Sequence, residues 1–260
     1  MKIACVGDNC IDAYDELGEY YPGGNPVNVA VYSSLLGNKA SYTGVVGDDE
    51  MGKLMICALS GKGVDISHLR VQRGKTAVTH VTYEGTNRIF GEYEEGVMAD
   101  FKLNEDDLDF LCSADIVVSG IWGKCEEHLH FIHERKVKVA FDFADKLESD
   151  IVKRAAKYVD CAFFSHDRDD SFIRDYLTDI CKMGAKKAVA TLGEKGSIAF
   201  DGKNFTVFGI VPCRVVDTLG AGDSYIAGFI NSMLCGGTTA ECMMAGAKTS
   251  SRALGVKGAW

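Results

Sequence analysis

The stretch at residues 215–231, VVDTLGAGDSYIAGFIN, constrains the fold of this chain more than any other. An apolar run ends at Val215 and Val216, glycines follow at 220 and 222, and apolar residues then recur at helical spacing. This pattern predicts a strand, a glycine turn and a helix. Asp223 falls in the first turn of the predicted helix, so its carboxylate lies beside the helix N-terminus.

The start of this helix is suited to phosphoryl transfer. Its first backbone N–H groups are unpaired and carry the positive end of the helix dipole. Gly220, Ala221 and Gly222 have no bulky side chain to keep an anion away. Phosphoryl transfer needs such donors for the moving charge, and a base, here Asp223, for the proton of the acceptor. The stretch alone equally allows Asp223 to be only a favourable charge at the helix dipole.

Two commoner phosphate-binding motifs fit the chain less well. The pattern GxxxxGK[ST] is absent, and GxGxxG would require a glycine at Tyr225. The stretch also lies late in the chain rather than in a first strand–helix unit, so a nicotinamide dehydrogenase is a remote alternative.

Strands and helices are expected to alternate along most of the sequence. A short apolar strand is predicted at 2–7, and from residue 115 onward segments of strand length alternate with segments of helix length. This alternation predicts one α/β domain over 1–260, with a doubly wound, mostly parallel sheet flanked by helices. Residues 77–95 differ, because two strand-like segments separated by Glu-Gly-Thr-Asn indicate a β-hairpin. The hairpin is either a covering lid or an edge for association with a second copy.

Polar residues near the first predicted strand and helix form a candidate acceptor site. They follow the carboxyl end of the strand at 2–7, where α/β sheets usually bind ligands, or they surround the start of the helix that contains Pro26. Asn25 is expected to cap that helix, whereas a capping role does not explain Asn28, one turn further on. Such side chains suit sugar hydroxyls, although each taken alone is more often structural. The candidates are Asp8, Asp12, Gly23, Gly24, Asn25 and Asn28.

A second glycine turn is a candidate nucleotide site. Thr191 lies at the end of a predicted strand, and Gly193 and Gly196 follow it directly. The turn suits the phosphates or ribose of a nucleotide, but Gly-x-x-Gly turns are common and the signal is weak by itself.

Charge and cysteine usage exclude several classes of protein. The net charge of −9 argues against a nucleic-acid partner or an anionic membrane. The ten cysteines include no CxxC pair, which disfavours a zinc or redox site. No apolar run has the length of a signal peptide or a membrane span, so a cytoplasmic protein is expected.

Two motifs together resemble those of the ribokinase-like (PfkB) carbohydrate kinases: DTLGAGDSYIAGF at 217–229 and GGNPVNVA at 23–30. The similarity extends over essentially the whole chain. It implies a ribokinase-like α/β fold with a small β lid, ATP and Mg²⁺ as cofactors, and a sugar as acceptor. Many members of the family carry an Asn-x-x-Glu motif that influences magnesium, and here the matching segment at 165–168 is Ser-His-Asp-Arg. Asp167 and Asp169 are the neighbouring carboxylates that remain as substitutes.

The resemblance also implies roles for individual residues. Asp223 would be the catalytic base, and the hairpin would be the lid, with Arg88 reaching the acceptor. Asp217 matches a position that helps to hold a monovalent cation such as K⁺. The remaining implied roles are an anion hole at Gly220, Ala221 and Gly222, acceptor binding by Asp12 and Asn28 with Gly23 and Gly24 shaping the pocket, and ATP contacts at Thr191, Gly193 and Gly196.

Further segments narrow the resemblance to one subgroup of the family. GVMADF at 96–101 and GAW at 258–260 are not general features of PfkB proteins. The subgroup implies phosphorylation of the 6-hydroxyl of fructoselysine or a related fructosamine, and a homodimer formed through the lid is one expected assembly. The alternatives are another PfkB-type sugar or nucleoside kinase and, more remotely, a non-catalytic sugar-binding protein.

Overall fold

The computed structural model describes residues 1–84 and 87–260, with the side chains of 83–90 left undescribed. Nine strands form the larger sheet: β1 (Lys2–Val6), β4 (Lys39–Gly47), β5 (Leu69–Gln72), β8 (Ile116–Gly120), β9 (Lys138–Asp142), β10 (Cys161–Ser165), β11 (Lys187–Thr191), β12 (Ser197–Phe200) and β13 (Phe205–Phe208). Their order across the sheet is β13-β12-β11-β10-β9-β8-β1-β4-β5. All neighbouring strands are parallel except β12, which is antiparallel to both β11 and β13. The predicted mostly parallel sheet is confirmed.

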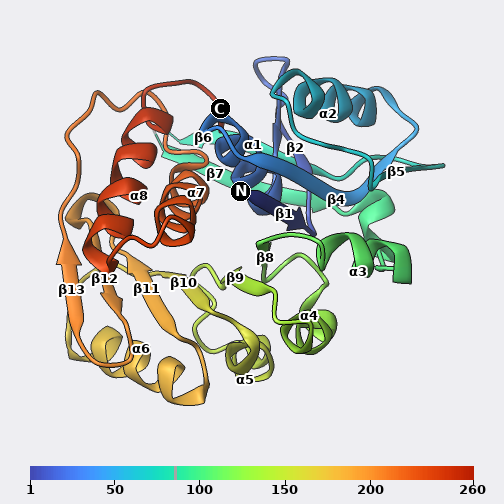
Figure 1. Ribbon diagram of the computed structural model, residues 1–260. Coiled ribbons are helices and arrows are strands. Elements are labelled where there is room, and N and C mark those ends of the chain that lie inside the picture. The colour runs from blue at the N-terminus through green and yellow to red at the C-terminus, as the bar shows by residue number, and fades with distance from the viewer. Residues whose placement is uncertain (85–86) are drawn as a thin grey trace.

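Helices cover both faces of this sheet (Figure 1). Successive residues of β1 point to opposite faces, so Ile3 and Cys5 enter one core and Ala4 and Val6 the other. The first core is covered by α1 (Asn25–Leu35), α2 (Glu50–Gly61), α7 (Ala221–Leu234) and α8 (Thr239–Ala253). The second is covered by α3 (Glu105–Leu111), α4 (Leu129–Glu134), α5 (Asp150–Ala155) and α6 (Ser171–Met183). Four short 3₁₀ helices complete the described helices: Gly96–Asp100, Glu126–His128, Ala156–Tyr158 and Gly193–Lys195.

A second sheet contains the predicted hairpin. Its strands are β2 (Cys10–Tyr14), β3 (Glu19–Gly23), β6 (Val78–Glu84) and β7 (Asn87–Glu94), in the order β3-β2-β6-β7. The antiparallel pairing of β6 with β7 confirms the hairpin, but β2 and β3 were not predicted as strands. The hairpin is therefore one half of a four-stranded sheet rather than an isolated insertion, and β2 brings Asp12 into that sheet.

The segment before α7 differs from the prediction. Val215 and Val216 were expected to end a strand, yet residues 209–220 form neither strand nor helix. Both valines are more than half exposed, and the N–H of Val216 donates to the carbonyl oxygen of Leu254 at 2.7 Å. This contact with the end of α8 replaces a sheet partner, because the strand pairing ends at β13.

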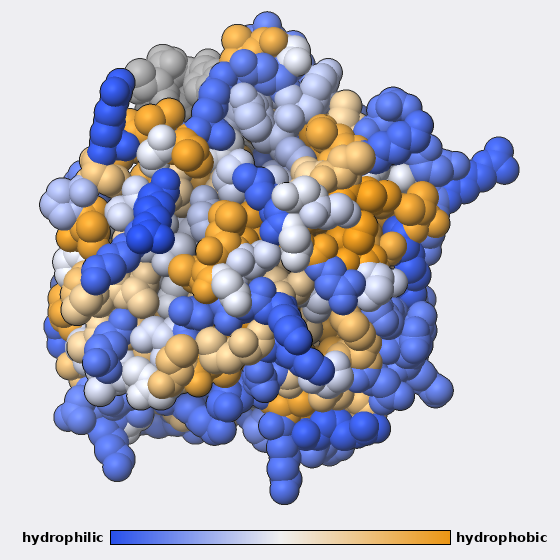
Figure 2. All heavy atoms as spheres, turned by 45° about the horizontal axis from the view of Figure 1, so that its top comes forward, coloured by the Kyte–Doolittle hydropathy of each residue, from blue (hydrophilic) through white to orange (hydrophobic). Residues whose placement is uncertain are grey.

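One face of the molecule carries both hydrophilic and apolar regions (Figure 2). Figure 2 shows hydrophilic residues over much of one face, with apolar residues gathered in patches between them. Among the described helices, none is both long and apolar enough to cross a membrane.

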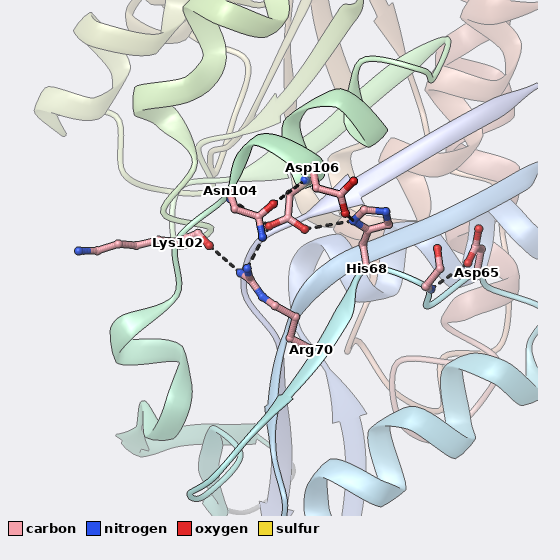
Figure 3. Close-up of polar contacts among 8 residues, drawn as sticks. Asp65, His68, Arg70, Lys102, Asn104 and Asp106 are labelled. Carbon is pink, nitrogen blue, oxygen red and sulfur yellow. Dashed lines mark hydrogen bonds and ion pairs between the residues drawn. The ribbon is translucent and has the colours of Figure 1, made fainter.

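The buried carboxylate of Asp107 joins the edge strand β5 to α3, and Figure 3 shows its neighbours His68, Arg70 and Asn104. The side chain of Asp107 accepts hydrogen bonds from the backbone N–H of Asn104 at 3.1 Å and lies 3.1 Å from both His68 Nδ1 and Arg70 Nη1. Asn104 in turn accepts from the N–H of Asp107 at 2.8 Å, which completes a capping box. Arg70 also donates to the carbonyl oxygen of Lys102 at 2.6 Å. The two carboxylate oxygens of Asp107 thus complete the helix cap and also form the ion pair with Arg70.

Replacing Asp107 by Ala is expected to destabilise the protein by about 2–4 kcal/mol, since it removes the cap and leaves Arg70 without its carboxylate. Urea unfolding at neutral pH measures the change. Asp106, the preceding residue, is a matched control because its side chain is 90% exposed. We expect Asp106→Ala to change the free energy of unfolding by less than about 0.5 kcal/mol. Equal effects of the two substitutions would contradict the role of Asp107.

Candidate functional site

Two amide side chains hold the carboxylate of Asp223. Asn25 Nδ2 donates to Asp223 Oδ1 and Asn28 Nδ2 donates to Asp223 Oδ2, each at 2.7 Å. The amides come from the first turn of α1 and the carboxylate from the first turn of α7, and these helices pack against each other (Figure 1). Because Asn25 and Asn28 are three residues apart, they lie on one face of α1 and approach the two oxygens together. The structure therefore brings together residues nearly two hundred positions apart that were predicted separately.

The start of α1 differs from the expected cap. Gly24 is the N-cap, with φ of 109°, and no side chain caps the helix. A Cβ at Gly24 would lie 2.7 Å from Cα of Asn9, so only glycine allows this close approach. Asn25, predicted as the cap, lies inside the helix, and its second N–H donates to Asp142 Oδ2 at 2.8 Å. The prediction of a capping Asn25 was wrong, because its side chain binds two carboxylates instead.

Asp8 and Asp142 complete a cluster of three carboxylates with Asp223. Asp8 Oδ2 accepts from the backbone N–H of Asn25 at 3.3 Å, whereas Asp8 Oδ1 is buried without a partner among the described residues. Asp142 lies at the carboxyl end of β9, and its Oδ1 accepts from the N–H of Ala144 at 2.9 Å. Asp142 was not among the predicted site residues. Its position at the carboxyl end of a parallel strand could have indicated a ligand-binding residue. Every other strand end of the sheet gives the same signal, so it did not single out Asp142.

Burial and mutual repulsion raise the pKa values of the cluster. Burial raises the pKa of Asp223 to about 6, and the hydrogen bonds from Asn28 and Asn25 oppose the increase. Burial, together with the charge of Asp223, raises the pKa of Asp8 to about 6 and that of Asp142 to about 7. A carboxylate with a pKa near 6 is mostly ionised at neutral pH and more basic than an ordinary aspartate, which suits a general base.

Asp12 lies in β2 beside the site, among residues that were predicted to form the acceptor pocket. Its side chain is buried, and its Oδ1 lies 3.6 Å from Cys10 Sγ, the donor. A Cβ at Gly23 would lie 2.6 Å from Asp12 Oδ2, so the glycine leaves room for this carboxylate. The side chain of Arg88, the remaining acceptor candidate, lies outside the described residues.

A cavity of about 460 Å³ adjoins the start of α7. The three residues predicted to contact a nucleotide, Thr191, Gly193 and Gly196, line it together with Ala221 and Gly222. Small and apolar residues from 209–215 and from α8 form much of the remaining wall. Drug-sized ligands commonly occupy cavities of this size, and a nucleotide falls in that range.

The helix start offers unpaired N–H groups next to this cavity. Gly220 is the N-cap of α7, with φ of 71°, a left-handed conformation that favours glycine. The N–H groups of Gly222 and Asp223 have no acceptor among the described residues. The N–H of Ala221 already donates to the carbonyl oxygen of Thr218 at 3.3 Å, so it is less available than expected. The arrangement is that of an anion site at a helix N-terminus.

Asp217 connects the turn before α7 to the segment after α8. Its two carboxylate oxygens accept from the backbone N–H groups of Leu219 at 2.8 Å and Gly258 at 2.9 Å. The side chain is buried. Its observed contacts therefore stabilise the turn, and the expected cation role remains a prediction.

One of the two carboxylates near the segment that replaces Asn-x-x-Glu is already in an ion pair. Asp169 forms a two-point ion pair with Arg174, with both distances at 2.6 Å. The backbone N–H of His166 donates to the carbonyl oxygen of Thr191 at 3.0 Å, which places the segment beside the cavity. Among the described residues, no group of three His, Cys, Asp or Glu side chains is arranged to hold a metal ion.

Comparisons with known proteins agree with this arrangement. The family model described as pfkB family carbohydrate kinase matches residues 2–260. The chain is 41% identical over 258 residues to a fructoselysine 6-kinase of Shigella flexneri, covering 99% of each chain. It is 33% identical to the fructosamine kinase FrlD of Bacillus subtilis, covering 100% of this chain and 93% of that one.

A solved structure shares the fold. The ribokinase of Arabidopsis thaliana, complexed with ribose and ATP, superposes with a TM-score of 0.86 at 24% identity, covering 99% of this chain and 94% of that one. The family match over nearly the whole length and the similarity to these relatives lead to one conclusion: the chain belongs to the pfkB family of carbohydrate kinases.

Proposed function

We propose that this carbohydrate kinase transfers the γ-phosphoryl group of ATP to the 6-hydroxyl of fructoselysine or a closely related fructosamine. The observation that carries the proposal is the position of Asp223. Its side chain is held by Asn25 and Asn28, two of the predicted acceptor residues, and its helix start adjoins a cavity large enough for a nucleotide. The choice of acceptor is supported by the names of the fructoselysine and fructosamine kinases that align with the chain.

The proposed reaction uses Asp223 as the base. Its carboxylate takes the proton of the 6-hydroxyl, the hydroxyl oxygen forms a bond to the γ-phosphorus, and the bond between that phosphorus and the β-phosphate oxygen of ADP breaks. The unpaired N–H groups of Gly222 and Asp223 stabilise the negative charge of the moving group. Asn25 and Asn28 keep the carboxylate directed at the acceptor.

Mg²⁺ and K⁺ are proposed to bind at different places. Mg²⁺ usually accompanies nucleotide phosphates, keeps several waters and neutralises charge on the transferring group. The described residues do not form a metal cage of their own, so we propose that Mg²⁺ is bound chiefly through the phosphates of ATP. For K⁺, Asp217 is the proposed anchor, since its buried carboxylate lies in the turn that leads into α7.

The hairpin of β6 and β7 is proposed as a lid over the acceptor. Tyr93 of β7 lies near the acceptor candidate Asp12, because it pairs with Thr79 of β6 and Thr79 pairs with Asp12 of β2. Closing a lid would exclude water and limit hydrolysis of ATP. We propose Arg88 as a lid residue that reaches the acceptor. The edge strand β7 is also the proposed contact of a homodimer, since it has one strand neighbour in its sheet.

A panel of acceptors tests the proposed substrate. We expect ADP release with fructoselysine to exceed that with fructose or ribose by roughly a hundredfold in kcat/KM, because a site that binds an amine-bearing acceptor leaves polar groups unpaired when the amine is missing. A coupled assay at matched ATP concentration measures the ratios. Equal or higher kcat/KM for fructose or ribose would favour another sugar kinase of the family. An absence of ADP release with every sugar would indicate a binding protein.

A further inference from the structure

The indole of Trp260 contacts the amide that holds Asp223. Trp260 Nε1 donates to Asn28 Oδ1 at 2.8 Å, and Asn28 Nδ2 donates to Asp223 Oδ2 at 2.7 Å. An indole N–H is only a donor, so it requires the oxygen end of the amide. The NH₂ end of Asn28 must then point the other way, towards the carboxylate.

We propose that Trp260 is a positioning residue, which fixes the orientation of the Asn28 amide and thereby the direction and basicity of the Asp223 carboxylate. The inference rests on the proposed role of Asp223 as the base. Without the indole donor, none of the described residues contacts the amide on that side in a way that distinguishes its two ends. A flipped Asn28 would place its oxygen against Asp223 Oδ2, where two acceptors repel each other.

The segment around Trp260 is held in place independently of Asn28. The N–H of Gly258 donates to Asp217 Oδ2 at 2.9 Å, and Tyr32 Oη donates to the carbonyl oxygen of Ala259 at 2.7 Å. The segment also packs closely on the start of α7, since a Cβ at Gly220 would lie 2.8 Å from the same carbonyl oxygen. These contacts fix the backbone, so Trp260 presents its indole from a defined position.

Several charged and titratable groups surround Asp223, so its ionisation depends on the orientation of the Asn28 amide. The charge of Asp223 raises the pKa values of Asp8, from the loop after β1, of Asp142, from β9, and of the phenol of Tyr32 on α1. Against these groups, the described donors to the carboxylate are the two amides of α1. Losing one of two donors should make Asp223 harder to ionise.

Trp260→Phe tests the proposal, because it removes the N–H and keeps a ring. We expect kcat to fall roughly three- to tenfold, the loss of about one hydrogen bond, and the acid limb of kcat/KM to move up by about half to one pH unit. Lys62→Gln is the matched control. Lys62 Nζ lies 5.4 Å from the centre of the Trp260 ring, so its loss disturbs the packing of the indole and leaves the N–H in place. The control should keep both kcat and the pH profile.

A double-mutant cycle with Asn28→Ala separates positioning from general packing. If Trp260 acts through Asn28, Trp260→Phe should have almost no further effect on kcat or on the acid limb in the Asn28→Ala background. Equal effects in both backgrounds, or an unshifted acid limb in Trp260→Phe, would overturn the proposal.

An NMR titration without acceptor tests the positioning role separately from the proposed function. The chain has two tryptophans, so the indole ¹⁵N–H signal of Trp260 is assignable by substitution. We expect this signal to titrate near pH 6 in the wild-type protein and to lose that inflection in Asp223→Asn. A signal that does not titrate would overturn the positioning role. Failure of fructoselysine in the acceptor panel would overturn only the proposed substrate.

Discussion

Replacing Asp223 by Asn is expected to lower kcat by roughly a hundred- to ten-thousand-fold, the contribution of a general base. The amide has nearly the same shape but cannot take the proton of the acceptor hydroxyl. The cavity that would hold the nucleotide is lined by other residues, so the dissociation constant of ATP should stay the same or fall slightly with the loss of a negative charge. Coupled ADP release and calorimetric titration with ATP measure the two quantities.

The pH dependence gives a second check on Asp223. Its pKa is raised to about 6, so the wild-type kcat/KM should rise with pH through that value as the carboxylate ionises. The residual activity of Asp223→Asn should lack this limb. Asp145→Asn is a suitable control, because Asp145 is exposed and paired with Lys146. An Asp223→Asn enzyme with near wild-type turnover would leave Asp223 with only the helix-dipole role.

Asp142→Asn is expected to lower kcat by roughly ten- to a hundredfold, although Asp142 is not the base. Both of its oxygens accept hydrogen bonds, one from the N–H of Ala144 and the other from Asn25 Nδ2. An asparagine that keeps the bond to Ala144 presents its NH₂ to the NH₂ of Asn25. Asn25 must then flip or move, and its bond to Asp223 is lost.

Stability measurements distinguish this effect from misfolding. The pKa of Asp142 is raised to about 7 in the folded protein, above its ordinary value of 3.8, so the folded state binds its proton more tightly than the unfolded state. The contribution of this group to stability is therefore present at low pH and lost as the pH rises towards about 7. We expect Asp142→Asn to weaken the decline in stability over this range while kcat falls. Unchanged kcat, or equal loss in Asp145→Asn, would contradict the positioning role.

The sequence was most informative where local pattern and chemistry agreed. The strands and helices predicted to alternate from residue 115 onward are present in the structure, and the glycines before Asp223 correctly indicated a helix start. Here apolar spacing and glycine placement act within a few residues, so they can be read without tertiary context.

The errors arose where tertiary contacts decided the outcome. The strands Cys10–Tyr14 and Glu19–Gly23 are short and include charged residues, so their polar side chains obscured the strand pattern. Val215 and Val216 have high strand propensity but no sheet partner. A capping role did not explain Asn28. Its contact with Trp260, 232 residues away in the chain, cannot be predicted from a local sequence pattern.

The cavity at the start of α7 is lined by residues from Thr191 onward, whereas Asn25, Asn28 and Asp142 all precede it in the chain. ATP and the acceptor would thus be recognised by different parts of the chain, which meet at the first turn of α7. Exchanging the N-terminal part between relatives should therefore change the acceptor specificity and leave the affinity for ATP unchanged.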